Sequence, residues 1–594
     1  MDSPFPVRRR HRFPETQVAL NSSGRDNPLA SSSCYLACDR GSSIRFGFLA
    51  ASFLLLAGAL FLLCLTPPVS RDALVHHLTV PKLYLEHGGM VELPHMNFSY
   101  YPGNLQLLFM IPMYFGNDIV PKLIHWAFGV GTALLVLFHL REKTGRNLAL
   151  LGAILFLSIP AIARLAITAY VDLGLIFFST ASLLAFLRWT ETGGIDQFFL
   201  GSAVFAGLAL GTKYNGLILI FVMACFVVLA SARRLGSVPR ASLRAAGMGI
   251  LFVVVSLVVF SPWMIRNYVW TKNPLHPLFS SAFSPGEEAS ARSALSLAGA
   301  RRLGLLDYRR NIFQESWTEI VLLPVRLFFQ GEDNNLRLFD GRLNPGLLIL
   351  PFFAFLPPLS GRTRSHARWL ALFSLLFFWY TFFGRELRAR YLIPIVPPLV
   401  ILAMMGLRNL WNRARAAKSA GAGKAGMAFL SVSVVLMLFW NGSYIRDQFV
   451  QVRPLSYLSG EVGRDDYIRA RRPEYSAMEF INRNLPEDAR ILFFFMGRRG
   501  YYCDRDFLFD SHDGRGSLLL DILGSAASPE SAAEILRSRG ITHFLIRASI
   551  FRRWIDESLE PENRMRLEAF LREKASAVFF RDGYAVLELI SNID

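Results

Sequence analysis

The sequence predicts a polytopic α-helical membrane protein with about eleven transmembrane helices and a C-terminal soluble α/β domain. Hydrophobic residues make up 53% of its 594 residues and charged residues only 18%, and the mean hydropathy is +0.34. This composition leaves too little polar surface for a water-soluble chain. Long apolar runs recur up to about residue 445, and shorter, alternating patterns follow them. The sequence thus predicts two regions in different solvents.

The apolar runs locate the predicted spans, because a helix needs ~20 apolar residues to cross the hydrocarbon of a bilayer. The predicted spans are 44–66, 119–140, 147–163, 170–188, 197–212, 214–231, 246–266, 343–358, 368–383, 390–408 and 425–445. The runs at 104–115 and 318–329 are too short to cross, and their aromatic and charged neighbours favour helices in the membrane interface. No short apolar core or cleavage-like site lies near Met1. The first span is therefore predicted to be an uncleaved anchor.

Lysine and arginine in the short connections predict the orientation, since positive loops stay on the cytoplasmic side. The basic segments are 1–43, 141–146, 232–244, 361–368 and 408–418. The N-terminus is thus predicted to be cytoplasmic, and the bacterial-type layout suggests an inner (plasma) membrane. The predicted parts are a cytoplasmic segment 1–43, a membrane domain 44–445 with external loops 67–118 and 267–342, and an external, periplasmic domain 446–594.

Charge and cysteine content exclude other classes of protein. Residues 446–594 hold 22 Lys and Arg against 24 Asp and Glu and are about neutral, so the basic excess (41 against 21) belongs to residues 1–445. Anionic lipid explains a basic excess beside membrane spans, and no nucleic-acid partner is predicted. The five cysteines are too few and scattered for a disulfide framework, and Cys34 and Cys38 lack the second pair that a zinc site needs.

The C-terminal domain shows alternating helix and strand patterns. Helices are predicted at 474–485, 528–540 and 562–574, and strands at 489–495, 541–548, 576–580 and 584–589. Tyr501 and Tyr502 either form a packed aromatic pair or shape the entrance for an acceptor. We assign no chemistry to this domain.

The first external loop carries the first candidate for catalysis. Residues 72–87 suit an interfacial helix, which Pro81 must kink or restart. Asp72, His76, Lys82 and Glu86 would face an aqueous cavity. Asp72 either caps this helix or acts as a general base that accepts a proton from an attacking hydroxyl or amine.

Further ionisable groups lie in the other external connections. Asp172 and Lys213 sit at similar depth, where charges are costly enough to favour a function, although a structural ion pair is the alternative. The connection 384–391 breaks the orientation rule with Arg385, Arg388 and Arg390. These guanidiniums either anchor lipid headgroups or bind a phosphate carried by a substrate.

Aromatic residues flank two of these connections. Arg266 lies among Trp263, Tyr268 and Trp270, which is typical of an interfacial aromatic belt. Tyr391 follows Arg390 and is either another interfacial aromatic or a hydrogen-bond donor to phosphate.

Several motifs occur in an order that resembles the GT-C superfamily of polyprenyl-phosphate-sugar-dependent glycosyltransferases. They are RDALVHHLTVPKLYLEHGGM, SYYPGNLQLL, AYVD, GTKYNG, PWMIRNYVWTKNPLHP and RARYLIPIVPPL. The likeness covers about residues 44–445 and is nearest to bacterial relatives of protein O-mannosyltransferases and lipid A aminoarabinose transferases. It implies a GT-C-like fold and transfer of a sugar, with inversion, from a polyprenyl phosphate to a lipid, glycan or protein acceptor.

The resemblance also implies roles for single residues. Asp72 matches the catalytic aspartate of the first loop and Asp172 the acidic residue of the second, and both are predicted to be catalytic. Lys213 matches the lysine that follows the fifth span, and the motifs on the lipid-phosphate side of the cavity match Arg266, Asn267, Arg390 and Tyr391. Further residues predicted to contact the lipid phosphate or sugar are His77, Lys82, Tyr101, Tyr214 and Arg385. Many relatives have Asp-Glu where this chain has Asp72 and Ala73, so a metal at that loop is not supported. The oligosaccharyltransferase signature WWDYG is absent.

The chemistry agrees with this resemblance. A polyprenyl phosphate leaves readily once cations neutralise it, so the enzyme needs cations at the phosphate, one base at the acceptor and no cofactor. The alternatives are a flippase or transporter of lipid-linked sugars, or a non-catalytic scaffold with a periplasmic binding domain. A transporter is disfavoured because the first-loop and TKYNG patterns have no second copy in the chain. A scaffold leaves the ordered Asp72, Asp172 and Lys213 unexplained.

Overall fold

The structure is a computed structural model that describes residues 28–236, 239–283, 305–357, 361–382, 387–510 and 516–590, with side chains from residue 43 on. The chain divides into two compact units, Met1–Phe48 and Leu49–Asp594. Helix α1 (Pro28–Cys64) begins in the first unit and ends in the second. Most of the predicted cytoplasmic segment and the predicted site residue Arg385 lie outside the described residues.

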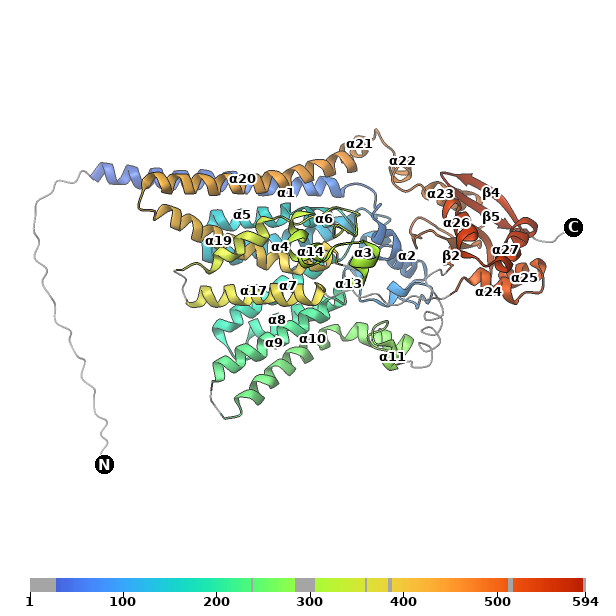
Figure 1. Ribbon diagram of the computed structural model, residues 1–594, viewed down its shortest axis with the longest axis horizontal. Coiled ribbons are helices and arrows are strands. Elements are labelled where there is room, and N and C mark those ends of the chain that lie inside the picture. The colour runs from blue at the N-terminus through green and yellow to red at the C-terminus, as the bar shows by residue number, and fades with distance from the viewer. Residues whose placement is uncertain are drawn as a thin grey trace, which may run out of the picture. The chain divides into compact units, whose positions relative to one another are not determined.

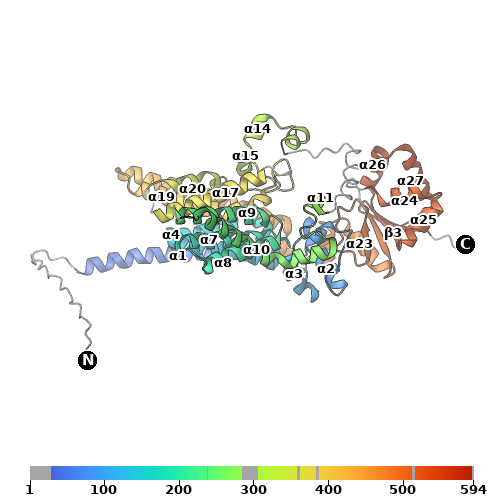
Figure 2. The ribbon, with the colours of Figure 1, turned by 90° about the horizontal axis from the view of Figure 1, so that it is seen from below.

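Long helices of the second unit run side by side (Figures 1 and 2). They are α4 (Val120–Thr144), α5 (Arg146–Ser158), α7 (Asp172–Thr192), α8 (Gln197–Thr212), α9 (Gly216–Leu235), α10 (Ala241–Thr271), α17 (Gly361–Phe382), α19 (Val396–Arg415) and α20 (Ala420–Val452). Phe186, Phe226 and Trp369 join α7, α9 and α17, with ring centroids 4.8 to 5.6 Å apart. Helix α20 instead exposes Phe429 and Phe439, as a helix facing lipid does.

Fewer helices than the predicted eleven are long and apolar enough to span a membrane. Among the described residues seven are, or up to eight if α5 and α6 (Pro160–Ala166) form one span. These two helices meet at a bend of 67°, where Pro160 cannot donate a helical hydrogen bond. The predicted span 343–358 is only a short helix over Gly346–Phe355, and α8, at the predicted span 197–212, is shorter than the helices that qualify as spans. Helix α17 occupies the place of the predicted span 368–383 but begins earlier, so that it includes Arg362 and Arg364.

Short helices build the segments between the long ones. In the first loop these are a π-helix at Ala73–His77, α2 (Thr79–Glu86), a 3₁₀ turn at Asn97–Tyr100 and α3 (Asn104–Tyr114). Pro81 lies in the first turn of α2, where its missing amide hydrogen costs no helical bond. Between α10 and α17 lie α11 (Ser280–Phe283), α13 (Leu305–Asp307), a π-turn at Tyr308–Ile312, α14 (Trp317–Val321), α15 (Leu323–Phe329), α16 (Gly346–Ile349) and a 3₁₀ turn at Leu350–Phe355.

Two further turns precede α19, namely α18 (Ala389–Leu392) and a 3₁₀ turn at Ile393–Ile395. After α20 the chain forms α21 (Pro454–Leu458), α22 (Arg464–Arg469) and α23 (Tyr475–Asn484).

A five-stranded sheet with the order β2-β1-β3-β5-β4 forms the C-terminal part. Its strands are β1 (Arg490–Phe494), β2 (Asp506–Phe509), β3 (Ile541–Arg547), β4 (Ala575–Arg581) and β5 (Tyr584–Leu589). β1 pairs in parallel with β2 and β3, whereas β5 pairs antiparallel with β3 and β4. α24 (Leu518–Ser525), α25 (Pro529–Ser538) and α27 (Pro561–Lys574) cover one face and α23 the other, while α26 (Ala548–Ser558) follows β3.

Polar contacts fasten this sheet domain to the first loop. The Lys82 ammonium donates to the backbone carbonyls of Tyr501 and Cys503 and lies 2.7 Å from the Asp504 carboxylate. The Tyr502 hydroxyl donates to the carbonyl of Pro68 at 2.6 Å. The segment 501–504 therefore positions the loop that carries Asp72.

Candidate active site

A cavity of about 810 Å³ opens where the first loop, the starts of α7 and α9, and α18 meet, and we call it the central cavity. The predicted site residues that line it are Asp72, His77, Tyr101, Asp172, Lys213, Arg390 and Tyr391. They come from segments as far apart in the sequence as residues 72 and 391. The helix order thus brings both predicted catalytic carboxylates to one cavity.

Asp72 pairs with Arg390 in this cavity, with 2.5 Å between the carboxylate Oδ2 and the guanidinium Nη1. Asp72 precedes the π-helix, but its side chain caps none of that helix's amides. Its backbone amide donates to the Tyr170 hydroxyl at 3.3 Å. Burial alone would raise the pKa of the Asp72 carboxyl, but the neighbouring groups, Arg390 foremost among them, together outweigh burial and hold the pKa below its usual value. Asp72 is therefore ionised at neutral pH.

Asp172 and Lys213 form a second pair 2.7 Å apart. Asp172 begins α7, where the helix dipole favours a carboxylate, and its side chain is almost fully buried. Lys213 ends α8, and its ammonium lies 5.4 Å from the centre of the Tyr391 ring. The Arg390 guanidinium lies 5.3 Å from the same ring. Both cations thus lie close to the Tyr391 ring.

Two histidines follow Asp72 and differ in their contacts. His77 Nδ1 lies 3.2 Å from the side-chain amide of Gln106, so this residue orients Gln106 rather than Asp72. His76 stacks on Phe98 and lines the central cavity, and its Nδ1 has no hydrogen-bond partner among the described residues. Burial lowers the pKa of His76 to about 4 and that of His77 well below its usual value. Both rings are therefore neutral at pH 7.

A second cavity, of about 640 Å³, adjoins the central one, and we call it the side cavity. Both cavities are lined by Arg71, Asp72, Arg388 and Arg390. The side cavity also contains Lys122. The Asp72–Arg390 pair thus stands where the two cavities meet.

Four predicted site residues lie outside both of these cavities. Lys82 binds the 501–504 segment, as described above. Arg266 donates to the carbonyls of Tyr100 and Tyr101 at 2.7 and 3.2 Å, and its guanidinium lies between Trp263 and Trp270. Asn267 donates to the carbonyl of Tyr100, and the Tyr214 hydroxyl donates to that of His276. Arg266, Asn267 and Tyr214 thus hold loop backbone to the membrane helices.

Sequence reasoning missed several residues at this site. The Tyr170 hydroxyl accepts a hydrogen bond from the Asp72 backbone amide, and Arg71 lines both cavities beside Asp72. His125 is fully buried, donates from Nδ1 to backbone carbonyls and accepts the Leu173 amide at Nε2, which fixes the start of α7. Of these, only Arg71 had a signal in the sequence, namely its place next to Asp72. Among the described residues, no three or more His, Cys, Asp or Glu side chains are grouped so that they could hold a metal ion.

The dolichyl-phosphate-mannose-protein mannosyltransferase family matches residues 109–265, about a quarter of the chain. In a sequence comparison with curated proteins, none matches the chain.

Several solved structures are similar to this chain, among them the following two. The first is ArnT from Cupriavidus metallidurans bound to undecaprenyl phosphate, which is 14% identical with a TM-score of 0.52, over 92% of this chain and 98% of ArnT. The second is the Archaeoglobus fulgidus oligosaccharyltransferase tethered with an acceptor peptide. It is 13% identical with a TM-score of 0.50, over 89% of this chain and 72% of that one. At these identities the likeness is one of fold. The chain thus has the GT-C fold, and the predicted resemblance to that superfamily is confirmed in the fold and in the family match over residues 109–265.

Proposed function

We propose that this chain is a membrane glycosyltransferase that moves a sugar from a polyprenyl-phosphate carrier to an acceptor, with inversion at the anomeric carbon. One observation carries the proposal: two carboxylates, each paired with a cation, face a single cavity. The match to a mannosyltransferase family and the GT-C fold support it. ArnT with this fold was solved with undecaprenyl phosphate bound, which supports a lipid phosphate as the carrier.

The donor phosphate would lie beside Lys213, Arg390 and Tyr391. Ammonium and guanidinium groups neutralise a phosphate, and the tyrosine hydroxyl donates a hydrogen bond to it. This neutralisation lowers the cost of releasing polyprenyl phosphate, and the cavity supplies it before the reaction begins.

Asp72 would serve as the general base. The acceptor hydroxyl or amine attacks the anomeric carbon as its proton passes to the Asp72 carboxylate. The bond between that carbon and the phosphate oxygen breaks, and the phosphate leaves with the electron pair. Because Asp72 lines both the central and the side cavity, it can meet an acceptor in either one. Asp172 would hold Lys213 in place, and we assign no cofactor to the reaction.

The site would face the outside of the cell. The basic connections that predict the orientation also place Asp72, Asp172, Lys213 and the sheet domain on the external side. A lipid-linked sugar is a suitable donor there, because its carrier remains in the membrane and no soluble nucleotide sugar is needed.

Transfer in proteoliposomes tests the proposal. The full-length chain is reconstituted with a lipid extract from the organism that produces it, and lipid-linked sugars are followed by mass spectrometry. A transferase releases free polyprenyl phosphate and adds one sugar to an acceptor in the extract. A transporter moves the donor between leaflets with its sugar still attached, and that result would overturn the proposal.

A further inference from the structure

A third cavity, of about 400 Å³, lies in the sheet domain, and we call it the domain cavity. It is formed by residues at or just beyond the carboxyl ends of three parallel strands: Phe495 after β1, Phe509 at the end of β2, and Arg547 at the end of β3. In the strand order β2-β1-β3, β1 is the middle strand: the chain passes from β1 to β2 on one side and later adds β3 on the other side. Such a switch point is where open α/β sheets bind ligands.

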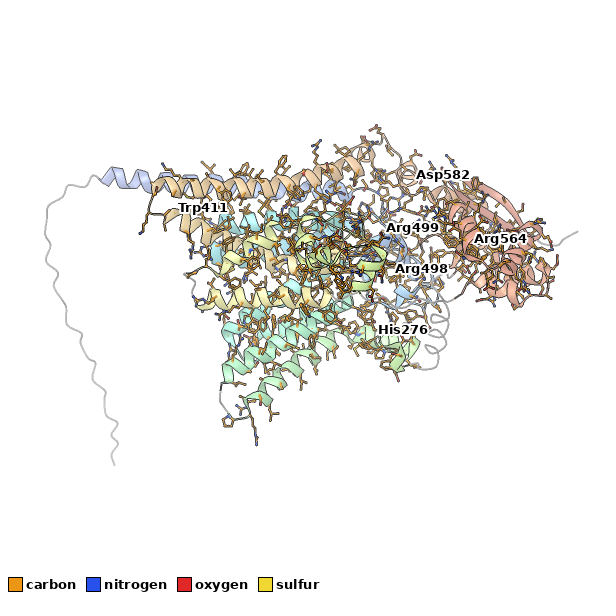
Figure 3. All side chains as sticks on the ribbon, viewed as in Figure 1. His276, Trp411, Arg498, Arg499, Arg564 and Asp582 are labelled. Atoms are coloured by element: carbon orange, nitrogen blue, oxygen red, sulfur yellow. The ribbon has the colours of Figure 1, made fainter. Side chains whose placement is uncertain are left out.

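The charge of the domain cavity favours an anion. Four arginines line it, namely Arg71, Arg498, Arg499 and Arg547, against one carboxylate, that of Asp510. Figure 3 labels Arg498 and Arg499, which follow β1.

Two of these arginines have free capacity to bind a ligand. Arg499 pairs with Glu474, and the Asp510 carboxylate accepts the Ser517 hydroxyl at 2.7 Å. Arg71 and Arg547 form no ion pair within the part of the chain that the structure describes. A guanidinium presents a planar fork of donors that matches the oxygens of phosphate or carboxylate. The volume is within the ~300–1,000 Å³ typical of small-ligand sites.

The domain cavity adjoins the central cavity. Arg71, Gly497 and Arg498 line both, and Arg71 directly precedes Asp72. A ligand held by Arg547 and Arg71 would therefore end one residue away from the proposed base. The side cavity also includes Arg71, so this arginine reaches all three cavities.

We infer that the domain cavity binds an oxyanion of the acceptor, a phosphate or a carboxylate, and so presents an acidic acceptor to Asp72. The identity of the ligand as the acceptor rests on the proposed function, whereas the anion site rests on the cavity alone. The function of the sheet domain would then be to select acceptors that carry negative charge.

Binding to the full-length protein in phosphatidylcholine nanodiscs tests the site. The probes are glucose 6-phosphate, glucuronate and uncharged glucose, followed by isothermal titration calorimetry. We expect the two anions, but not glucose, to bind, and the stronger anion identifies phosphate or carboxylate as the natural group. Arg547→Gln should weaken that binding at least tenfold. Ile550→Glu, which places a carboxylate in the same cavity, should do the same if Arg547→Gln misfolds.

A control variant separates this site from the rest of the protein. Arg553→Gln removes an exposed arginine of α26 that does not line the cavity and should leave binding unchanged. Wild-type affinity in both Arg547→Gln and Ile550→Glu, or loss of binding in Arg553→Gln, would overturn the inference.

A transfer assay then separates the two proposals. If the chain is a transferase, Arg547→Gln should raise the KM for the acceptor and leave kcat and the KM for the donor unchanged. If anions bind in an Arg547-dependent way but the wild-type chain transfers no sugar, the proposed function is refuted and the anion site stands. Transfer with an unchanged acceptor KM would keep the function and refute the role of the domain cavity.

Discussion

Replacing Asp72 with asparagine should remove transfer and leave the fold intact. Asparagine has nearly the size of aspartate, and its amide oxygen still accepts the hydrogen bond from Arg390. It cannot take up the proton of the acceptor. A general base contributes roughly 10²–10⁴-fold to a rate, so we expect transfer to fall at least about 100-fold.

The cost to stability should be small. The Asp72 and Arg390 side chains are 22% and 19% exposed, so water reaches the pair and screens it. A hydrogen bond to a charged group contributes about 1.5–3 kcal/mol, and asparagine retains the neutral part of it. We therefore expect a loss of about 1 kcal/mol, measured by thermal unfolding in the same nanodiscs.

Asp118→Asn is the matched control. Asp118 also pairs with an arginine, Arg464, at 2.5 Å, but it lies outside the three cavities and is more deeply buried. This variant should lose at least as much stability and keep its transfer rate. Transfer within tenfold of wild type in Asp72→Asn would refute the role of Asp72. Loss of transfer in both variants would mean that stability, rather than a base, explains the effect.

Three other substitutions test charges and contacts elsewhere. Lys213→Met leaves the buried Asp172 carboxylate without its cation and should lower the free energy of unfolding by about 3 kcal/mol. Adding Asp172→Asn to this variant should restore most of the lost unfolding temperature, and a double variant as unstable as Lys213→Met would argue against the pair. Burial raises the pKa of Asp510 to about 6, so the folded chain holds a proton that the unfolded chain loses near pH 4, and stability falls as the pH rises between these values. Asp510→Asn should remove this dependence and stabilise the protein at pH 7.5 by up to about 3 kcal/mol, as judged by thermal unfolding at pH 5 and 7.5. Arg266→Lys cannot keep the paired hydrogen bonds to first-loop carbonyls, so limited proteolysis should cut the first loop faster, and an unchanged rate would contradict the role given to Arg266.

The membrane helices could be predicted from local pattern, but not how each one spans. The long helices at 120–144 and 420–452 could be predicted, because apolar length alone identifies such helices. Pro160 breaks the predicted span 147–163 into two helices, and the extent of that bend depends on packing around it. The segments 197–212 and 346–355 are helical but shorter than a membrane span. Both pack against neighbouring helices, and such tertiary contacts cannot be predicted from apolar length alone.

In the sheet domain, the predicted strands and helices correspond to β1, β3, β4, β5, α23, α25 and α27. The prediction missed β2, which has only four residues, Asp506–Phe509, and lies at the edge of the sheet. So short a run has no clear alternation. Without β2 the strand order has no switch point, and the domain cavity could not be foreseen.

Pairing across the chain was the least predictable feature of the candidate site. Asp72, Asp172, Lys213 and Arg390 each stood out as a charge beside a membrane span. Which carboxylate pairs with which cation depends on how α7, α8 and α18 pack, and 318 residues separate Asp72 from Arg390. Arg266 had equal promise in the sequence, but its donors are committed to first-loop carbonyls.

The Asp72–Arg390 pair also predicts that the donor activates the base. A phosphate bound at Arg390 competes with Asp72 for the same guanidinium. As Arg390 turns to the phosphate, the contact that holds the pKa of Asp72 down weakens while burial continues to raise it, so this pKa should increase. The acidic limb of kcat/KM reports the free enzyme, and that of kcat reports the complex with bound substrate. We therefore expect the acidic limb of kcat to have its midpoint at higher pH than that of kcat/KM, measured as transfer between pH 3.5 and 8. Coincident midpoints would show that Arg390 stays on Asp72 throughout the reaction, and the phosphate would then have to be neutralised by Lys213 without it.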